Sequence, residues 1–565
     1  MACLLAMVTL SLTSCVSDNN GSSDSIFDYT NNDVKSYGDL FDIFWKVMNQ
    51  RYNYLNEQQG TFALNWDQVY SDYKPKFEAL LTFDRSSKWT VSQIQADHDK
   101  AQEYFKEIVN HILDQHFRLT VKLPISHTSF DKVTFSSQGI QREGCTMPLW
   151  MHFDYTLQEL CNDDNLIDYN TQNFSMLGGF VKGEPNTYYL AFSKFALGDN
   201  CTYSYKSQYL PQDKNSSYWL SKETIDQQIS TLVDATGQRE TIRQAAYKLY
   251  DSFENYMNSE DVKAAISKMV AYAQEGKYEG LLANVKKAHS EMPLPLQTFT
   301  NVDAVKQMQE QLEDGLQNHP EYDALNENLS FRTWLLKALA AYLCNVRELD
   351  SFCNDANFTL QHPLVELYPK CFIENLKSGK IQKLILDFRG NGGGAVSDTR
   401  LLTDFLITHS KAYCYIRLKE DNNPYSYTPW IPQYIEQTSN SIGRDIPIAC
   451  IIDQGSGSMS ETTTLLLRGQ GDHVRIVGRN SAGAFSMLSQ SGAANGGWNG
   501  NVTDYLSFYM PFMAVKDLNG NILEGYGLTP DYIIDPISSD EATAINLQLP
   551  TAKDKFFDKA VETLK

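Results

Sequence analysis

The feature that most constrains the fold is a repeated order of elements in the C-terminal half of the chain: a buried apolar strand, a loop of small residues and a helix. The first case is KLILDF followed by RGNGGG, residues 383–394, and the second is IPIACIID with GSGSMSE, residues 446–461. Strands that alternate with helices favour a parallel sheet covered on both faces. Sites in such sheets form at the carboxyl ends of the strands, where both loops lie. We therefore expect an α/β core with a site built from these two loops.

The first 25 residues have the pattern of an export signal. Residues 4–12 form an apolar run that is shorter than the roughly 20 residues a membrane-spanning helix needs, and it leads into Leu12-Thr13-Ser14-Cys15. This ending resembles a bacterial lipobox, in which the cysteine is diacylated and becomes the new N-terminus. Residues 16–25 are small and polar, as in a flexible tether. We expect a lipid anchor at Cys15 and a location in the bacterial cell envelope, at the outer membrane, with the lipid as the only contact with the membrane.

Composition excludes several classes of function. With 69 acidic and 48 basic residues the formal net charge is −21, which repels phosphate backbones and argues against a nucleic-acid partner. The eight cysteines after Cys15 show no Cys-x-x-Cys pair and no Cys/His cluster of zinc spacing, so we predict no metal and no cofactor. Cys344 and Cys353 either pair in an oxidising compartment or remain buried thiols.

The two loops carry the residues with chemical potential. The glycine loop lacks the Lys-Ser/Thr of a P-loop, so an oxyanion hole is a better interpretation than a phosphate-binding loop, and a plain tight turn is the other alternative. The second loop places Ser458 and Ser460 before a helix, where the helix dipole favours a developing negative charge. Either serine can be a nucleophile, and Ser460 can instead cap the helix that carries Glu461. The residue pattern alone does not choose between them.

Four ordered motifs resemble one serine peptidase family, which includes the C-terminal processing peptidases, the tricorn protease core and the retinoid-binding repeats. The motifs are KLILDFRGNGGG, IIDQGSGSMSETTTLLLRG, VRIVGRNSAG and LEGYGLTPDYIIDP. The resemblance implies an α/β fold with a parallel-sheet core of the ClpP/crotonase-like kind, an N-terminal helical domain and a large helical insertion. We predict this order: 1–25, signal peptide and tether; 26–135, helical domain; 136–205, first part of the core; 206–362, helical insertion; 363–549, catalytic core; 550–565, C-terminal helix.

The resemblance also implies roles for single residues. The family's nucleophile is the first serine of an S-x-S-E motif, which is Ser458 here. Its oxyanion hole would combine the N–H of Met459 with that of Gly393. The insertion lacks clusters of catalytic residue types, so we interpret it as a lid or docking element over the cleft.

The general base must be a residue other than the one at position 484. One branch of the family uses a lysine at the position of Ala484, which cannot accept a proton. The tricorn-like branch takes its base from a D-x-H motif, and Asp114-Gln115-His116 fits that pattern, with Glu524 of the LEG motif completing the relay. An imidazole with a pKa near ~6.5 can accept a serine proton at neutral pH. His111 and His152 are the alternative bases.

Together these features predict a secreted, lipid-anchored serine endopeptidase that cleaves proteins or peptides through an acyl-enzyme on Ser458. One alternative is an inactive family member that binds a peptide or an apolar ligand at the cell surface. Another is a glycan-binding lipoprotein of the outer membrane, which would need neither the glycine loop nor the SMSE segment. Composition does not set the oligomeric state.

Overall fold

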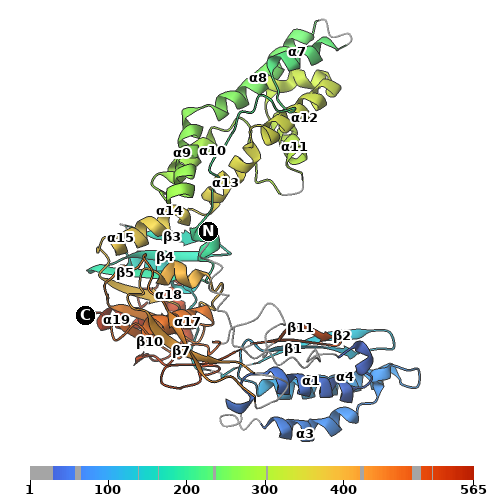
Figure 1. Cartoon of the computed structure of the whole chain (residues 1–565), viewed down its shortest axis with the longest axis vertical. Coiled ribbons are helices and arrows are strands. Elements are labelled where there is room, and N and C mark those ends of the chain that lie inside the picture. Colours follow the sequence, from blue (N-terminus) through green and yellow to red (C-terminus); the bar gives the residue numbers. More distant parts are fainter. Residues whose placement is uncertain are drawn as a thin grey trace, which may run out of the picture. The chain divides into compact units, whose positions relative to one another are not determined.

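The computed structural model describes residues 29–57, 65–137, 139–140, 142–162, 165–232, 237–300, 303–419, 426–485, 498–511 and 513–565. The predicted signal segment and its lipidation site, Cys15, lie outside these residues. The chain forms two compact units, whose elements are labelled in Figure 1. Unit 1 takes the residues up to Ile140, Tyr415–Ile431 and Ser486–Lys516, and unit 2 takes Gln141–Cys414, Pro432–Phe485 and Asp517–Lys565.

Unit 1 combines helices with an antiparallel sheet of order β11-β12-β1-β2. Its helices are η1 (Asn31–Asp33), α1 (Tyr37–Arg51), α3 (Trp66–Glu78), η2 (Thr82–Asp84) and α4 (Val91–Asn110). Its strands are β1 (Arg118–Pro124), β2 (Phe130–Ser136), β11 (Trp498–Thr503) and β12 (Leu506–Met510). The region predicted as helical therefore also holds a sheet.

Local sequence signals explain where the helices of unit 1 begin. The side chains of Ser36, Asn65 and Thr90 accept backbone N–H bonds at the starts of α1, α3 and α4. Aromatic rings fill the core: Phe44 packs against Trp66, Phe105 and Phe508.

The sheet of unit 1 recruits residues from the C-terminal half of the chain. Leu119 of β1 lies opposite Phe508 of β12 on one side and opposite Phe135 of β2 on the other. Strands β11 and β12, which the sequence placed in the catalytic core, therefore belong to unit 1 through strand pairing. No local pattern encodes such a partner, because it is more than 350 residues distant along the chain.

Unit 2 is built on a seven-stranded sheet of order β14-β10-β9-β6-β5-β4-β3. Five of the strands are parallel, and β4 and β3 add an antiparallel edge. The α/β class with a parallel-sheet core is thus confirmed, as a mixed sheet. The strands are β3 (Ile167–Asn170), β4 (Ser175–Val181), β5 (Glu184–Phe192), β6 (Lys383–Asp387), β9 (Ile448–Ile452), β10 (Val474–Gly478) and β14 (Tyr532–Ile533). A third sheet has the order β13 (Ala514–Lys516), β7 (Lys411–Arg417) and β8 (Ile431–Ile435), and its β13 belongs to unit 1.

The central strands are apolar on both faces, as a doubly covered sheet requires. Leu386 of β6 pairs between Leu190 of β5 and Cys450 of β9, and all three are buried. The surrounding helices of unit 2 are α5 (Leu149–Tyr155), η3 (Thr156–Leu160), α6 (Leu197–Cys201), α14 (Leu364–Tyr368), η5 (Pro369–Ile373), α15 (Glu374–Lys377), α16 (Asp398–Thr403), α17 (Met459–Arg468), α18 (Ser539–Asn546) and α19 (Lys555–Thr563). Of these, α17 packs on β10, and α19 packs on β9 and β10.

A set of helices between β5 and β6 has a core of its own. These helices are α7 (Lys222–Ser230), α8 (Arg239–Met257), α9 (Glu260–Glu275), α10 (Leu281–Ser290), α11 (Ala304–Leu316), η4 (Pro320–Glu327), α12 (Leu329–Asn345) and α13 (Leu349–Gln361). Their buried residues form one apolar cluster that runs from Tyr205 to Val365. Figure 1 shows them as the green and yellow helices that extend beyond β3 and β4 in unit 2.

A further prediction concerns the cysteines. Cys344 and Cys353 are buried free thiols, so the alternative without a disulfide holds. Among the described residues, no helix is long and apolar enough to cross a membrane.

Candidate active site

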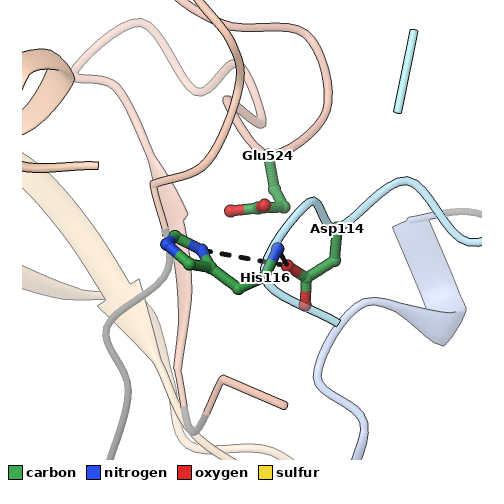
Figure 2. A group of neighbouring side chains, drawn as sticks. All are labelled: Asp114, His116 and Glu524. Carbon is green, nitrogen blue, oxygen red and sulfur yellow. Dashed lines mark hydrogen bonds and ion pairs between the residues drawn. The ribbon is translucent and has the colours of Figure 1, made fainter. Parts of the chain in front are cut away.

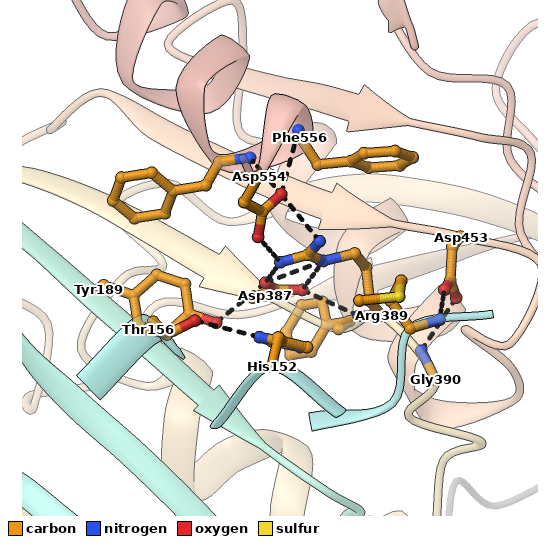
Figure 3. A network of polar contacts seen from close by, with 12 residues as sticks. His152, Thr156, Tyr189, Asp387, Arg389, Gly390, Asp453, Asp554 and Phe556 are labelled. Atoms are coloured by element: carbon orange, nitrogen blue, oxygen red, sulfur yellow. Dashed lines mark hydrogen bonds and ion pairs between the residues drawn. The ribbon is translucent and has the colours of Figure 1, made fainter. Parts of the chain in front are cut away.

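Arg389, the first residue of the glycine loop, is held by two buried carboxylates (Figure 3). Its Nη2 lies 2.6 Å from Asp387 Oδ2 and 2.7 Å from Asp554 Oδ2, and all three side chains are 1% exposed. Burial would raise the pKa of Asp387, but the Arg389 charge and its hydrogen bonds hold that pKa below its ordinary value. Asp554 also accepts the N–H groups of Phe556 and Phe557 at the start of α19. The loop is thereby fixed both to β6 and to the C-terminal helix.

Asp453 fixes the place where the two small-residue loops meet. It follows β9, is fully buried, and accepts N–H bonds from Gly390 at 2.9 Å, Gly455 at 2.9 Å and Met147 at 2.7 Å. The glycines are needed here, because a Cβ on Gly455 would lie 2.8 Å from the Cα of Gly390. The carboxyl ends of β6 and β9 are therefore joined, as expected for neighbouring parallel strands.

Asn391 ties the glycine loop to the serine loop. Its side-chain Nδ2 donates to Phe192 O at 2.7 Å, and its side-chain Oδ1 accepts the N–H of Gly393 at 3.0 Å. Its backbone oxygen accepts the N–H of Gly457 at 3.0 Å and the hydroxyl of Ser460 at 2.6 Å. One buried residue thus sets the relative position of both loops.

Ser458 stands at a strained turn directly before α17. Its backbone has φ 52° and ψ −114°, a left-handed conformation that is costly for a residue with a side chain. Its N–H donates to Glu461 Oε2 at 2.9 Å, and its side chain is only half-buried. A half-buried serine at a positive-φ turn between a strand and a helix start is the arrangement that exposes a nucleophile.

Ser460, the other candidate nucleophile, is placed differently. It is 0% exposed, and its hydroxyl donates to the Asn391 backbone oxygen. This hydroxyl is a structural hydrogen-bond donor inside the loop pair. Of the two serines, Ser458 is therefore the one that a substrate can reach.

The two predicted oxyanion donors lie beside Ser458. Gly393 has φ 97°, and a Cβ there would lie 2.6 Å from Ser458 Cβ and 2.7 Å from Met459 N. Met459 N–H is the first amide of α17, a position that has no acceptor within the helix. The N–H of Gly393, in contrast, donates to Asn391 Oδ1. The structure thus brings Gly393, Ser458 and Met459 together, with one of the two amides already engaged.

Glu461, three residues after Ser458, connects the nucleophile to the neighbouring loop. It is 0% exposed and accepts four hydrogen bonds, from Ser458 N–H, Ser481 Oγ–H, Gly483 N–H and Ala484 N–H, at 2.5 to 2.9 Å. Burial raises its pKa to about 7, although the four donors act in the opposite direction. From the sequence, Glu461 was considered only as part of a capped helix start. Its place at the third position of α17 is typical of a capping box, and this pattern could have predicted its contact with the N–H of Ser458.

Glu524 lies on the loop next to this network. It is 2% exposed, and its Oε2 accepts the N–H of Phe485 at 2.9 Å. Ala484, which stands where the lysine branch has its base, is buried and contributes only its backbone N–H, to Glu461. Ser458, Glu461 and Glu524 are therefore linked through residues 481–485 within unit 2.

The D-x-H motif belongs to unit 1, between α4 and β1 (Figure 2). The buried carboxylate of Asp114 accepts the backbone N–H of His116 at 2.8 Å, whereas its distance to the imidazole Nδ1 is 4.0 Å. Asp114 thus fixes the turn on which His116 stands. Burial, and next the positive charge of Arg118, lower the pKa of His116 to about 4, which keeps the imidazole neutral at pH 7.

The two alternative bases have different surroundings. His111 directly follows α4 as its C-cap residue and is exposed. His152 is 1% exposed on α5, and its Nδ1 lies 3.2 Å from Thr156 Oγ1 (Figure 3). Burial, and next the positive charge of Arg389, lower the pKa of His152 to about 4. His152 is therefore a core residue that solvent and substrate do not reach.

Comparison with known proteins yields one family. Residues 369–534 match the model of peptidase family S41, a range that contains the glycine loop, the serine turn and Glu524. No curated protein matches the chain.

Several solved structures are similar. A peptidase from Parabacteroides merdae has 11% identity and a TM-score of 0.41, with 94% of this chain and 96% of that chain covered. Mature CPAF complexed with lactacystin has 8% identity and a TM-score of 0.41, with 94% and 98% covered. The tricorn protease has 18% identity and a TM-score of 0.22, with 38% and 20% covered. Residues 369–534, which hold both catalytic loops, are similar to the peptidases of family S41, and this match indicates a serine-type peptidase.

Proposed function

We propose that the chain is an endopeptidase that cleaves proteins or peptides through an acyl-enzyme on Ser458. The observation that carries this proposal is the turn at Ser458, where a strained, half-buried serine packs against Gly393 while Ser460 is buried and hydrogen-bonded. Strain at a single non-glycine residue persists only where the surroundings impose it, and such residues concentrate at functional sites.

In the proposed reaction His116 is the general base. Its neutral imidazole takes the hydroxyl proton as Ser458 Oγ bonds to the scissile carbonyl carbon, and Glu524 orients the ring. The same proton then passes to the departing amine as the carbon–nitrogen bond breaks. Water, activated by the imidazole, attacks the ester and releases Ser458. This tricorn-like plan is supported by the D-x-H turn at His116 and by Ala484, whose side chain has no basic group.

The oxyanion of the tetrahedral intermediate would bind Met459 N–H and Gly393 N–H. Each such donor contributes about 3 kcal/mol to transition-state stabilisation. Because Gly393 N–H donates to Asn391 Oδ1 in this structure, it must turn toward the substrate or share its proton during the reaction.

That same contact favours a second candidate function. With one oxyanion donor engaged, the chain would be an inactive family member that holds a peptide or apolar ligand at the cell surface. Activity measurements separate the two. The endopeptidase proposal predicts internal cleavage of an unfolded protein substrate by the wild type and by Ser460→Ala, and none by Ser458→Ala. Absence of cleavage in all three would support the binding function.

We further propose export and lipid attachment at Cys15, at the outer membrane of a bacterial envelope, with the helices between β5 and β6 acting as a lid or docking element. Labelling with a fatty-acid analogue in the native host should modify the wild type and fail for Cys15→Ala. Equal labelling of both would exclude this anchor.

A further inference from the structure

The loop of residues 478–485 and the turn of residues 523–528 interlock within unit 2. Gly525 N–H donates to Gly483 O at 2.6 Å, and Leu528 N–H donates to Ser481 Oγ at 2.7 Å. Gly483 has φ 84°, and a Cβ there would lie 2.5 Å from the carbonyl carbon of Gly525. The two segments therefore approach as closely as bare backbones allow.

Arg142, from the irregular segment before α5, spans this junction. Its Nη1 donates to Ala482 O at 3.2 Å, and its Nη2 donates to Tyr526 O at 2.6 Å and Gly525 O at 3.4 Å. One planar guanidinium thus binds carbonyl oxygens of both segments at once. A lysine ammonium is a point charge and cannot reproduce this fork.

The carboxylate of Glu461 also binds the loop of residues 478–485. Glu461 accepts the N–H groups of Gly483 and Ala484, and the guanidinium of Arg142 donates to the carbonyl oxygen of Ala482. The backbone of residues 482–484 is thus bound by a carboxylate and by a guanidinium. The next N–H, that of Phe485, donates to Glu524. The position of the Glu524 carboxylate therefore depends on the contacts that both Arg142 and Glu461 make with this loop.

We propose that Arg142 is a positioning residue for Glu524, acting through the backbone of residues 482–485 and of the turn that carries Glu524. The inference rests on the proposed function in that Glu524 orients the base of Ser458. In the lysine branch the corresponding loop carries the base itself, whereas here the loop is a scaffold fixed by a cation from a distant part of the chain.

The test combines a structural readout and a chemical readout on the full-length chain. Hydrogen–deuterium exchange is followed at the amides of Gly483, Phe485, Gly525 and Leu528, and the rate of Ser458 labelling by a fluorophosphonate is measured in parallel. The variants are Arg142→Met, which keeps the stem and removes the fork, and Arg142→Lys. The matched control is Arg479→Met, since Arg479 lies in the same loop but its guanidinium donates to Ile534 O, at 3.4 Å, outside the junction.

For Arg142→Met we expect exchange at these amides to accelerate at least tenfold and labelling to slow by about 10- to 100-fold, as a displacement near 1 Å does in active sites. Arg142→Lys should recover part of both effects, and Arg479→Met should change neither by more than twofold. Unchanged exchange in Arg142→Met, or equal loss in Arg479→Met, would overturn the inference. If Arg142→Met does not fold, Arg142→Lys is used for the same test. Exchange and labelling rates equal to those of the wild type would then overturn the inference.

The two proposals fail in different ways. If the wild type is never labelled, the proposed function fails, while the exchange measurement still decides whether Arg142 holds the turn. If the wild type is labelled and Arg142→Met is labelled at the same rate, the assignment of Arg142 as a positioning residue for Glu524 fails alone.

Discussion

Replacing Gly393 by alanine tests the contact between the glycine loop and the nucleophile. The added Cβ would lie 2.6 Å from Ser458 Cβ, 2.7 Å from Met459 N and 2.9 Å from Gly457 O, against 3.4 Å for the onset of ordinary contact. Two of these three atoms are backbone, so rotation of a side chain cannot relieve the overlap. The loop or the serine turn must instead move by roughly 0.8 Å.

This displacement sets the expected magnitude. A shift of about 1 Å in reacting groups costs about 10²-fold in rate. An L-residue at φ 97° is also strained, by about 1–3 kcal/mol. We therefore expect Gly393→Ala to lower kcat/KM for a peptide substrate by about 10²- to 10³-fold, and Tm to fall by several degrees.

The neighbouring residue supplies the control. A Cβ on Gly392 meets no atom within 4 Å, and its φ is not in the left-handed range. Gly392→Ala should therefore keep kcat/KM within about threefold of the wild type, as for a surface substitution without new contacts. If Gly393→Ala retained wild-type kcat/KM, or if both variants lost the same amount, the proposed packing of the glycine loop on Ser458 would be refuted.

Three other predictions follow from single contacts. Ser460→Ala should lower the free energy of unfolding by about 1–2 kcal/mol, because the buried Asn391 oxygen loses a donor, while kcat/KM stays within tenfold of the wild type. A loss of kcat/KM equal to that of Ser458→Ala would contradict the assignment of Ser458 as the nucleophile. Asp554→Asn should reduce kcat/KM at least tenfold by releasing Arg389 from α19, and an unchanged value would show that Asp387 holds the glycine loop alone. Because Glu461 has its pKa raised from 4.5 to about 7, the folded state binds its proton more tightly than the unfolded state. The free energy of unfolding should therefore fall by about 3 kcal/mol as pH rises through this interval, and Glu461→Gln should remove that slope in denaturant titrations at several pH values; an equal slope in the variant would assign it to other groups.

The local parts of this site were predictable from the sequence. The strand, small-residue loop and helix pattern placed the loops of Gly393 and Ser458 at the carboxyl ends of strands, because parallel strands bring these ends to one edge of the sheet. The choice between Ser458 and Ser460 came from the motif resemblance, since both serines occupy similar local positions. The hydrogen bond from Ser460 to Asn391 then separates them in three dimensions.

The long-range parts were not predictable in the same way. Arg142 binds carbonyl oxygens 340 to 384 residues away along the chain, and Asp554 binds Arg389, 165 residues away. Neither residue belongs to a periodic or motif-like stretch. The pairing of β12 with β1 is of the same kind, because alternation predicts a strand but not its partner. The hydrogen bond that engages Gly393 N–H also depends on side-chain geometry that the glycine pattern does not contain.

Direct observation of the acyl-enzyme tests the central claim. The chain is mixed with a slowly hydrolysed activated ester, quenched in acid and measured by intact mass, and the modified peptide is then sequenced by mass spectrometry. We predict one acyl group per chain, located on Ser458, formed at least 10³-fold more slowly in His116→Ala and absent in Ser458→Ala. An acyl group on another residue, an equal rate in His116→Ala, or turnover of the ester without any covalent intermediate would contradict the account.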